Sequence, residues 1–386
     1  MPASISSSAL SVPGSRIREL AEIAMGMDGV LKLYFGEADI PTPAFIQQAA
    51  QKALSDGYTY YTENAGLPSL REELARYYSR LHGVELDPSS EIAVTASGVQ
   101  ALSLALRCLV DPGDEAFVLT PAWPNGASIL RLAHAVVHEM PQVLRGDRYA
   151  VDFDALEAAV TPRTRVLLYT SPSNPLGWVA TANDQDRLLE FARRHKLWLV
   201  ADEVYERLFY AGSTVPSILC KATRDDAVIV VQSFSKAWCM TGWRLGWLVA
   251  RKDFLSHAIP LNEFFVSCAA SFVQKAAETA LRDGEDWIRT LVARLKNNRD
   301  YALAALRRMP GVVVPEPDGA FYLFPRIEGA GDSFAFAKRL LMETKVGLAP
   351  GVAFGAGGEG NVRICYASQR EVVEEAMIRM ASFLMR

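Results

Sequence analysis

Short apolar runs that alternate with helical patterns constrain the fold of this chain more than any other feature of its sequence. The runs lie at residues 92–95, 116–119, 166–169, 197–201, 228–231 and 245–250. Mainly amphipathic helical stretches or polar loops separate them. Strands that are apolar on both faces are typical of a parallel sheet that helices cover on both sides. We therefore expect an α/β fold with a mostly parallel sheet.

The pattern changes after residue 285, which indicates a second and smaller domain. A chain of 386 residues is also too long for one hydrophobic core. A long helical segment at about 286–308 precedes short apolar runs at 312–314, 320–324, 346–348 and 362–366 and a last helix at about 370–385. Strands with helices on one side are typical of an α+β domain. We predict an N-terminal arm that belongs partly to the small domain (1–40), a large domain (41–285) and a small C-terminal domain (286–386).

The composition excludes several classes of protein. The net charge of −4 gives no field that would attract nucleic acid or an anionic membrane. No apolar stretch approaches the ~20 residues that a membrane span requires, and the N-terminus lacks the basic region of a signal peptide. The five cysteines are far apart, with no CxxC pair and no histidines at metal spacing. We expect reduced thiols, no metal site and a cytoplasmic location.

Polar side chains that could do chemistry follow four of the apolar runs. They are Ser97 with Gly98, Asn174, Asp202, and Ser233 with Lys236. The carboxyl ends of parallel strands meet at one edge of the sheet, and open α/β sheets bind their ligands there. We therefore expect one crevice to hold all of these residues.

Three positions in the sequence predict the binding of a charged group. A carboxylate at Asp202, directly after a strand buried on both faces, needs a cationic partner; capping of a helix N-terminus is the alternative. The small residues at 97–99 precede a helical pattern that starts near Gln100, and a helix N-terminus is an anion site. Arg363 lies in an apolar strand pattern, where an unpaired cation is costly, so an anion-binding role is favoured.

Three motifs together resemble the signature set of class I aminotransferases, the aspartate aminotransferase family of fold-type I enzymes. They are SPSNPLG at 171–177, DEVYE at 202–206 and SFSKAWCMTGWRLG at 233–246. The resemblance runs from GEAD at 36–39, through Tyr61 and Gly66, to PGVAFG at 350–355 and Arg363. It implies a sheet of the seven-stranded type in the large domain, and a pyridoxal 5′-phosphate-dependent aminotransferase of amino-acid metabolism.

The resemblance also implies roles around the ring of the cofactor. Lys236 would hold the cofactor as a Schiff base and, once released, carry the substrate's α-proton. Asp202 would face the pyridine nitrogen, whose protonation makes the ring an electron sink. Tyr205 and Asn174 would donate to the phenolic oxygen. Trp123 would stack on the ring, although a core tryptophan explains that residue nearly as well.

The phosphate and the substrate have their own implied ligands. The implied phosphate ligands are Ser97, Gly98, Val99, Ser233 and Arg244. Tyr61 resembles a tyrosine that reaches across a dimer interface to this phosphate, so the active unit would be a homodimer. The implied substrate ligands are Arg363, which would grip the α-carboxylate in a bidentate pair, Gly36, which allows close backbone approach, and Asn174.

The substrate itself is less constrained by the sequence. Some dicarboxylate-specific relatives place a lysine at the position of Val99, and this chain has Leu176 where SNPTG would be usual. We expect ping-pong transamination from a neutral or aromatic L-amino acid, with aspartate still open, to 2-oxoglutarate or pyruvate. Two alternatives stay open: a pyridoxal phosphate-dependent lyase or synthase of the C–S lyase type on the same fold, and a non-catalytic ligand-sensing domain.

Overall fold

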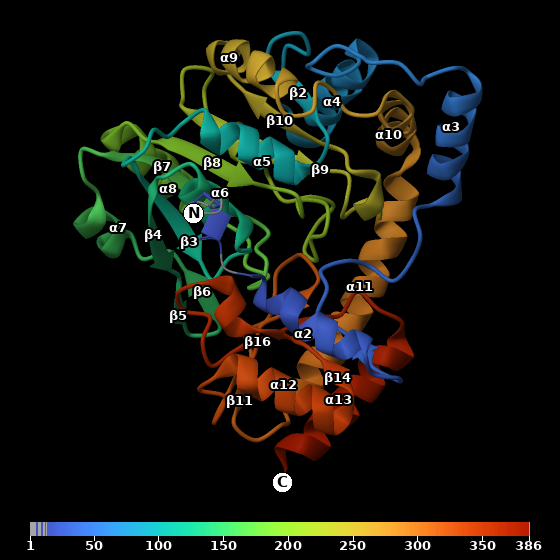
Figure 1. Ribbon diagram of the computed structural model, residues 1–386, viewed down its shortest axis with the longest axis vertical. Helices are drawn as coiled ribbons and strands as arrows, with labels where there is room; N and C mark the ends of the chain where they lie inside the picture. The colour runs from blue at the N-terminus through green and yellow to red at the C-terminus, as the bar shows by residue number, and fades with distance from the viewer. Residues whose placement is uncertain (1–4, 7–8, 11, 13, 386) are drawn as a thin grey trace.

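A seven-stranded sheet forms the centre of the larger part of the molecule (Figure 1). The structure is a computed structural model that describes residues 5–6, 9–10, 12 and 14–385. From edge to edge the strands are β2 (Ile92–Thr95), β10 (Gly246–Ala250), β9 (Val228–Ser233), β8 (Trp198–Asp202), β7 (Thr164–Thr170), β3 (Glu115–Thr120) and β4 (Val136–Pro141). β10 is antiparallel to both neighbours, and the other neighbouring pairs are parallel. The predicted α/β fold with a mostly parallel sheet is confirmed.

β4 is the one strand of this sheet that the apolar pattern missed. It pairs with β3 at the edge, and its side chains are only partly buried or exposed. Because solvent reaches these side chains, the sequence VVHEMP carries no continuous apolar run, whereas β2 at the opposite edge is buried throughout. The other strands are buried over nearly their whole length, and each coincides with a predicted run.

Helices cover both faces of the sheet. In β3, Ala116 and Val118 pack in one core cluster, while Phe117 and Leu119 pack in the other. This alternation is the two-residue period of a strand. The face that carries Ala116 and Val118 is covered by α5 (Gly98–Arg107), α6 (Asn125–Leu132) and α9 (Lys252–Glu263). The second cluster includes side chains from α3 (Ala44–Ser55), α4 (Pro68–His82), α7 (Phe153–Ala159), α8 (Ala182–His195) and α10 (Ser271–Asp283).

A smaller α+β region lies below the sheet in Figure 1 and is reached through the long helix α11 (Glu285–Leu306). Its antiparallel sheet has the order β12 (Tyr322–Leu323), β16 (Val362–Cys365), β15 (Ala349–Pro350). Its other elements are β11 (Val312–Val313), β13 (Arg326–Ile327), α12 (Ser333–Thr344), β14 (Val346–Gly347) and α13 (Arg370–Leu384). A separate hairpin joins β5 (Val143–Arg145) to β6 (Arg148–Ala150).

The N-terminal segment contacts elements of this smaller region. β1 (Leu31–Lys32) pairs in parallel with β14, and α2 (Arg16–Met25) packs on α12 and β15. Figure 1 shows α2 along the boundary between the two parts of the molecule. The predicted division at residues 40 and 285 stays a prediction, and residues 1–4, 7–8, 11 and 13 of its arm, with Arg386 at the other end, lie outside the described residues.

Two predictions made from the composition can be compared with the structure, one on the cysteines and one on membrane spans. All five cysteines are free thiols. Among the helices of the described residues, none combines the length and the apolar character that crossing a membrane requires. The predicted cytoplasmic location stays a prediction.

Candidate active site

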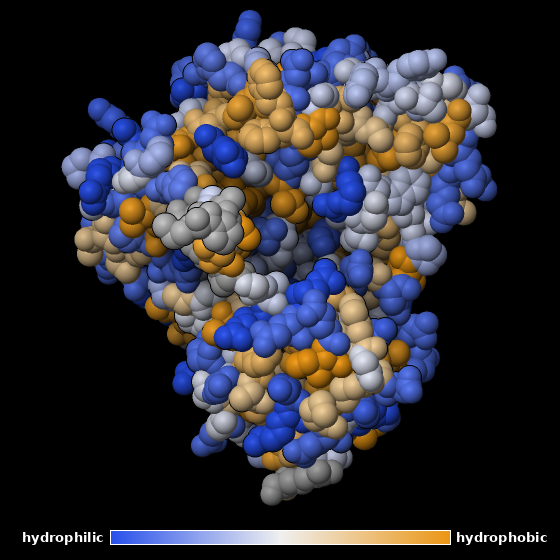
Figure 2. Space-filling view, in the orientation of Figure 1, coloured by the Kyte–Doolittle hydropathy of each residue, from blue (hydrophilic) through white to orange (hydrophobic). Residues whose placement is uncertain are grey.

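A cavity of about 580 Å³ opens at the carboxyl ends of the parallel strands. Figure 2 shows the hollow between the upper and lower parts of the molecule. Its lining includes most of the residues predicted for the site: Gly36, Gly98, Val99, Trp123, Asn174, Asp202, Tyr205, Ser233, Lys236, Arg244 and Arg363. Residues that are far apart in the sequence are thus brought to one edge of the sheet, as the strand pattern predicts.

Lys236 lines this cavity. It follows β9 by three residues, and its Nζ donates a hydrogen bond of 2.7 Å to the carbonyl oxygen of Gly36. Burial is the main cause that lowers the pKa of Lys236, to about 8. An amine with this pKa is partly unprotonated near neutral pH, which suits it to attack a carbonyl group and to accept a proton.

Asp202 is a buried carboxylate without an ion-pair partner among the described residues. It ends β8, and its Oδ1 accepts a hydrogen bond of 3.3 Å from the backbone N–H of Val204. Burial raises the pKa of Asp202 to about 6, and the charge of Lys236 opposes this shift. Residues 204–207 form turns instead of a helix, so the helix-capping alternative does not hold. The carboxylate is free to pair with a cationic ligand.

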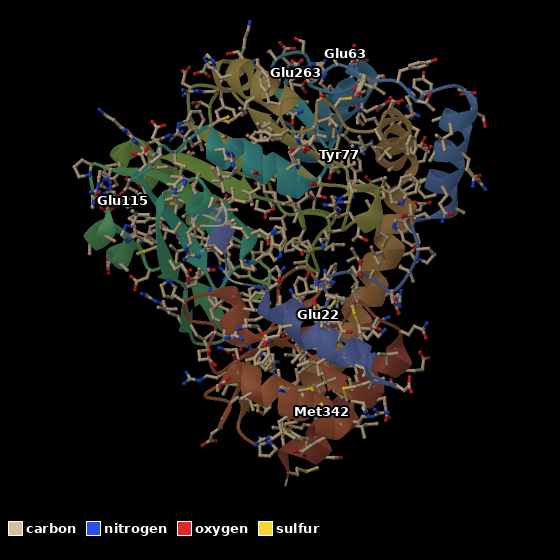
Figure 3. All side chains as sticks on the ribbon, in the orientation of Figure 1. Glu22, Glu63, Tyr77, Glu115, Glu263 and Met342 are labelled. Atoms are coloured by element: carbon tan, nitrogen blue, oxygen red, sulfur yellow. The ribbon has the colours of Figure 1, made fainter. Side chains whose placement is uncertain are left out.

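The turn after β8 positions Tyr205 and is anchored from its buried side. The hydroxyl groups of Tyr205 and Tyr322 share a hydrogen bond of 2.8 Å. Glu206, the next residue, accepts a hydrogen bond from the buried Tyr77 and lies 3.2 Å from Nε2 of His82. Figure 3 labels Tyr77 among the side chains of the upper part. These contacts hold the turn, and with it the direction of the Tyr205 ring, against α4.

Arg363 is a buried cation that has no acidic partner among the described residues. It lies in β16 and is only 2% exposed. Its Nη1 donates to Oδ1 of Asn174 at 3.0 Å, and its Nη2 donates to the carbonyl oxygen of Tyr34. Its Nε is buried and makes no hydrogen bond in the described residues. An unpaired guanidinium at a cavity wall is suited to bind a carboxylate.

Gly36 lies between Lys236 and Tyr322. A side chain at this position would place its Cβ 2.3 Å from the hydroxyl oxygen of Tyr322. A glycine is therefore required for the backbone to approach the cavity as closely as it does.

The part of the cavity wall that the N-terminus of α5 forms is suited to bind an anion. Gly98 and Val99 are the first residues of α5, so their N–H groups lack partners within the helix. Ser233 lies beside Gly98, since a Cβ at Gly98 would be 3.0 Å from the Cβ of Ser233, and the exposed Arg244 also lines the cavity. Gly246 allows this approach, because a Cβ there would lie 2.4 Å from the backbone nitrogen of Gly98.

Ser97 and Tyr61 are the two predicted residues that do not line the cavity. Ser97 caps α5, and its Oγ accepts a hydrogen bond of 3.1 Å from the N–H of Gln100. Its φ of 131° is a conformation that favours glycine. Tyr61 is 88% exposed, and Figure 3 labels Glu63, two residues later in the chain, at the upper end of the molecule. The roles predicted for both residues stay predictions.

Several cavity residues were missed in the sequence. Tyr34, Phe35, Glu37, Ser235, Thr241 and Tyr322 line the cavity, and so do Ser15, Ile17 and Arg18 from the start of α2. Tyr322 comes from β12 and Arg18 from a helix of another part of the chain. No local motif marks these two residues. Glu37, Ser235 and Thr241 lie inside the motifs at 36–39 and 233–246, and Tyr34 and Phe35 precede the first of these motifs, which offered a signal for them.

The donor set fits pyridoxal 5′-phosphate. A buried carboxylate without a partner matches a protonated pyridine nitrogen, and an amine with a lowered pKa matches an aldehyde. The N-terminus of α5 with Arg244 matches a phosphate group. The described residues contain no cluster of three or more acidic, histidine or cysteine side chains that could bind a metal ion.

Comparisons with known proteins agree with this assignment. Residues 29–380 match the family described as aminotransferase class I and II. An aspartate aminotransferase of Pyrococcus abyssi is 37% identical over 96% of this chain and 95% of its own. An aromatic-amino-acid aminotransferase of Thermococcus litoralis is 35% identical over the same shares. A solved aspartate aminotransferase of Thermus thermophilus with maleate superposes with a TM-score of 0.92, at 31% identity over 99% and 100% of the two chains.

Proposed function

This chain belongs to the class I and II aminotransferase family, and from that premise we propose that it transfers the amino group of a neutral or aromatic L-amino acid to 2-oxoglutarate or pyruvate. The enzyme is a pyridoxal phosphate-dependent aminotransferase that acts on amino and oxo acids. The finer proposal depends mainly on Val99, which places an apolar side chain in the cavity wall where some dicarboxylate-specific relatives have a lysine. Ile17 and Phe35 add apolar surface to the same wall.

Different side chains of the site would bind different parts of the cofactor. When bound, pyridoxal phosphate supplies an aldehyde for covalent attachment of an amine and a ring that withdraws electrons from the substrate's α-carbon. Asp202 would hold the pyridine nitrogen protonated, and Tyr205 and Asn174 would donate to the phenolic oxygen. Trp123 would pack on the ring. The N-terminus of α5, with Ser97, Ser233 and Arg244, would bind the phosphate.

Lys236 is the group that would move the proton. Its pKa of about 8 leaves a useful fraction of free amine near neutral pH, so Nζ can accept the α-proton of the substrate and return it. Arg363 and Asn174 would fix the substrate's α-carboxylate, and with it the direction of the bond that breaks. The reaction runs in two halves: the donor leaves as a 2-oxo acid, and the acceptor then takes up the amino group.

An exposed apolar surface supports a homodimer. Tyr60, Tyr61 and Phe264 are each more than 80% exposed. They lie on two neighbouring segments, because the N–H of Thr62 contacts Sγ of Cys268 at 3.4 Å. Exposed apolar patches of this kind are typical of interaction sites. We propose that a second copy covers this surface and that Tyr61 reaches the partner's phosphate site.

Arg363→Lys tests the carboxylate site. We expect the apparent KM for the amino donor to rise roughly 10- to 100-fold, because lysine cannot make the bidentate pair. Arg299→Lys is the matched control, since Arg299 is also a buried arginine that stacks on a tyrosine, Tyr210, but lies outside the cavity lining. Initial rates against donor concentration measure the effect. An unchanged KM in Arg363→Lys would remove Arg363 from the substrate site.

A donor screen tests the substrate class. Each L-amino acid is added to the purified holoenzyme, and the absorbance change from the aldehyde-derived to the amine form of the cofactor is recorded. We expect the fastest conversion with neutral or aromatic amino acids. Conversion by aspartate or glutamate alone would contradict the proposal. Release of ammonia and a 2-oxo acid without an acceptor would instead indicate a lyase.

A further inference from the structure

We propose that Arg18, in the first turn of α2, binds the distal carboxylate of a five-carbon dicarboxylic 2-oxo acid and so selects the amino acceptor. This inference depends on the proposed function, because it assigns the second carboxylate of 2-oxoglutarate to a named side chain. It concerns the acceptor half of the reaction and adds a cation that the sequence patterns did not indicate.

Arg18 is an unpaired cation at the rim of the cavity. Ser15 caps α2 and accepts a hydrogen bond of 3.2 Å from the backbone N–H of Arg18, which fixes where the side chain starts. The guanidinium lies 5.3 Å from the centroid of the Phe35 ring. Within the described residues its side chain makes no ion pair or hydrogen bond, although Glu22 follows one turn later on α2, as Figure 3 shows. The guanidinium is therefore available to a ligand.

The segment 34–36 places Arg18 beside the reacting groups. Arg363 donates to the carbonyl oxygen of residue 34, Arg18 lies over the ring of residue 35, and Lys236 donates to the carbonyl oxygen of residue 36. Three cations thus contact three consecutive residues. A ligand with one carboxylate on Arg363 and its reacting carbon near Lys236 would therefore point its far end toward Arg18.

The proposed function assigns a role to each other cation that the described residues place in the cavity lining, but none to Arg18. Among the described residues, the cations of the lining are Arg18, Lys236, Arg244 and Arg363. In the proposed function, Lys236 serves the reaction, Arg244 the phosphate and Arg363 the α-carboxylate. The distal carboxylate of a dicarboxylic acid is assigned to none of these three groups, and arginine is well suited to bind it in a bidentate pair.

The surroundings of Arg18 also accommodate substrates without a second charge. Ile17, Phe35 and Val99 are apolar members of the same lining. A neutral or aromatic donor can lie against this wall while Arg18 stays over the Phe35 ring at the exposed rim. The same cavity can therefore take an uncharged side chain in one half-reaction and a carboxylate in the other.

Arg18→Gln tests this assignment in the holoenzyme. The amine form is mixed with 2-oxoglutarate or with pyruvate, and the absorbance change gives an apparent dissociation constant for each acid. We expect the value for 2-oxoglutarate to rise roughly 10- to 100-fold and that for pyruvate to change less than about 3-fold, because only the first acid loses a charge-assisted pair. Arg16→Gln is the matched control: Arg16 lies on the same helix and stacks on Phe334, but pairs with Glu19 and does not line the cavity.

A binding measurement separates this inference from the proposed function. Glutarate, which has both carboxylates and no oxo group, and butyrate, which lacks the distal carboxylate, are titrated into the holoenzyme by calorimetry. We expect glutarate to bind more tightly than butyrate in the wild type and Arg16→Gln, and this difference to disappear in Arg18→Gln. An equal loss for both 2-oxo acids, an unchanged constant for 2-oxoglutarate or no preference for glutarate would overturn the inference. If no amino acid reacts, the proposed function fails while the glutarate titration still decides the role of Arg18.

Discussion

Lys236→Ala is expected to lower the rate of amino transfer by about 10³- to 10⁴-fold, within the range that a positioned proton-transfer group contributes. The variant loses the lysine amine that, among the described residues, lines the cavity. It keeps the N-terminus of α5, Arg244 and Asp202, so pyridoxal phosphate should still bind. Single-turnover rates with a good donor measure the first effect, and retention of the cofactor after gel filtration measures the second.

Lys221→Ala provides the control for this experiment. Lys221 is a surface residue that pairs with Asp186 at 3.0 Å and lies outside the cavity lining, so its replacement should leave turnover unchanged. Partial restoration of turnover in Lys236→Ala by added methylamine would support a role of the missing amine in proton transfer. Turnover of Lys236→Ala within tenfold of the wild type would contradict the proposed mechanism.

Asp202→Asn is expected to weaken cofactor binding by roughly 10²- to 10³-fold, the size of effect that follows when one partner of a buried ion pair is removed. Asparagine has nearly the same shape but no charge to hold a proton on the pyridine nitrogen. Turnover at saturating cofactor should also fall, because an unprotonated ring withdraws electrons less strongly. Equilibrium titration with pyridoxal phosphate, followed by absorbance, measures the affinity.

The pH dependence of cofactor binding gives an independent test of the same carboxylate. The pKa of Asp202 is raised to about 6 in the cofactor-free site, mainly by burial. The charged form binds the protonated ring, so affinity should be full above pH 6 and should fall as the pH drops through about 6. Asp202→Asn should lack this step, whereas the surface variant Asp186→Asn should keep it. An identical pH profile in Asp202→Asn and the wild type would assign the step to another group.

The fold was predictable where burial alone dictates the residue types. Each buried strand of the main sheet coincides with a predicted apolar run, because both of its faces pack against helices. β4 was missed because solvent partly reaches its side chains, unlike those of β2 at the opposite edge. The aminotransferase resemblance, which depended on the motifs at 171–177, 202–206 and 233–246, is confirmed by the family match.

The candidate site was predictable where its residues follow strands. Asp202 and Ser233 end β8 and β9, Asn174 and Lys236 follow β7 and β9, and the direction of parallel strands alone brings them to one edge. The positions of Arg18 and Tyr322 could not be predicted in this way. Each depends on how a separate element packs across the boundary between the sheet and the smaller region.

By itself, the sequence determined the class of fold and the chemistry that is available. Apolar periodicity and local motifs carry that information, since both depend on residues that are neighbours in the chain. Only the tertiary structure decided which charges are unpaired. Asp202 and Arg363 are buried with no ion-pair partner in the described part of the chain, and Arg18 lies over Phe35 at the cavity rim. Whether a charged group finds a partner depends on contacts between distant segments, so the ligands that these groups can bind follow from packing and not from the order of residues.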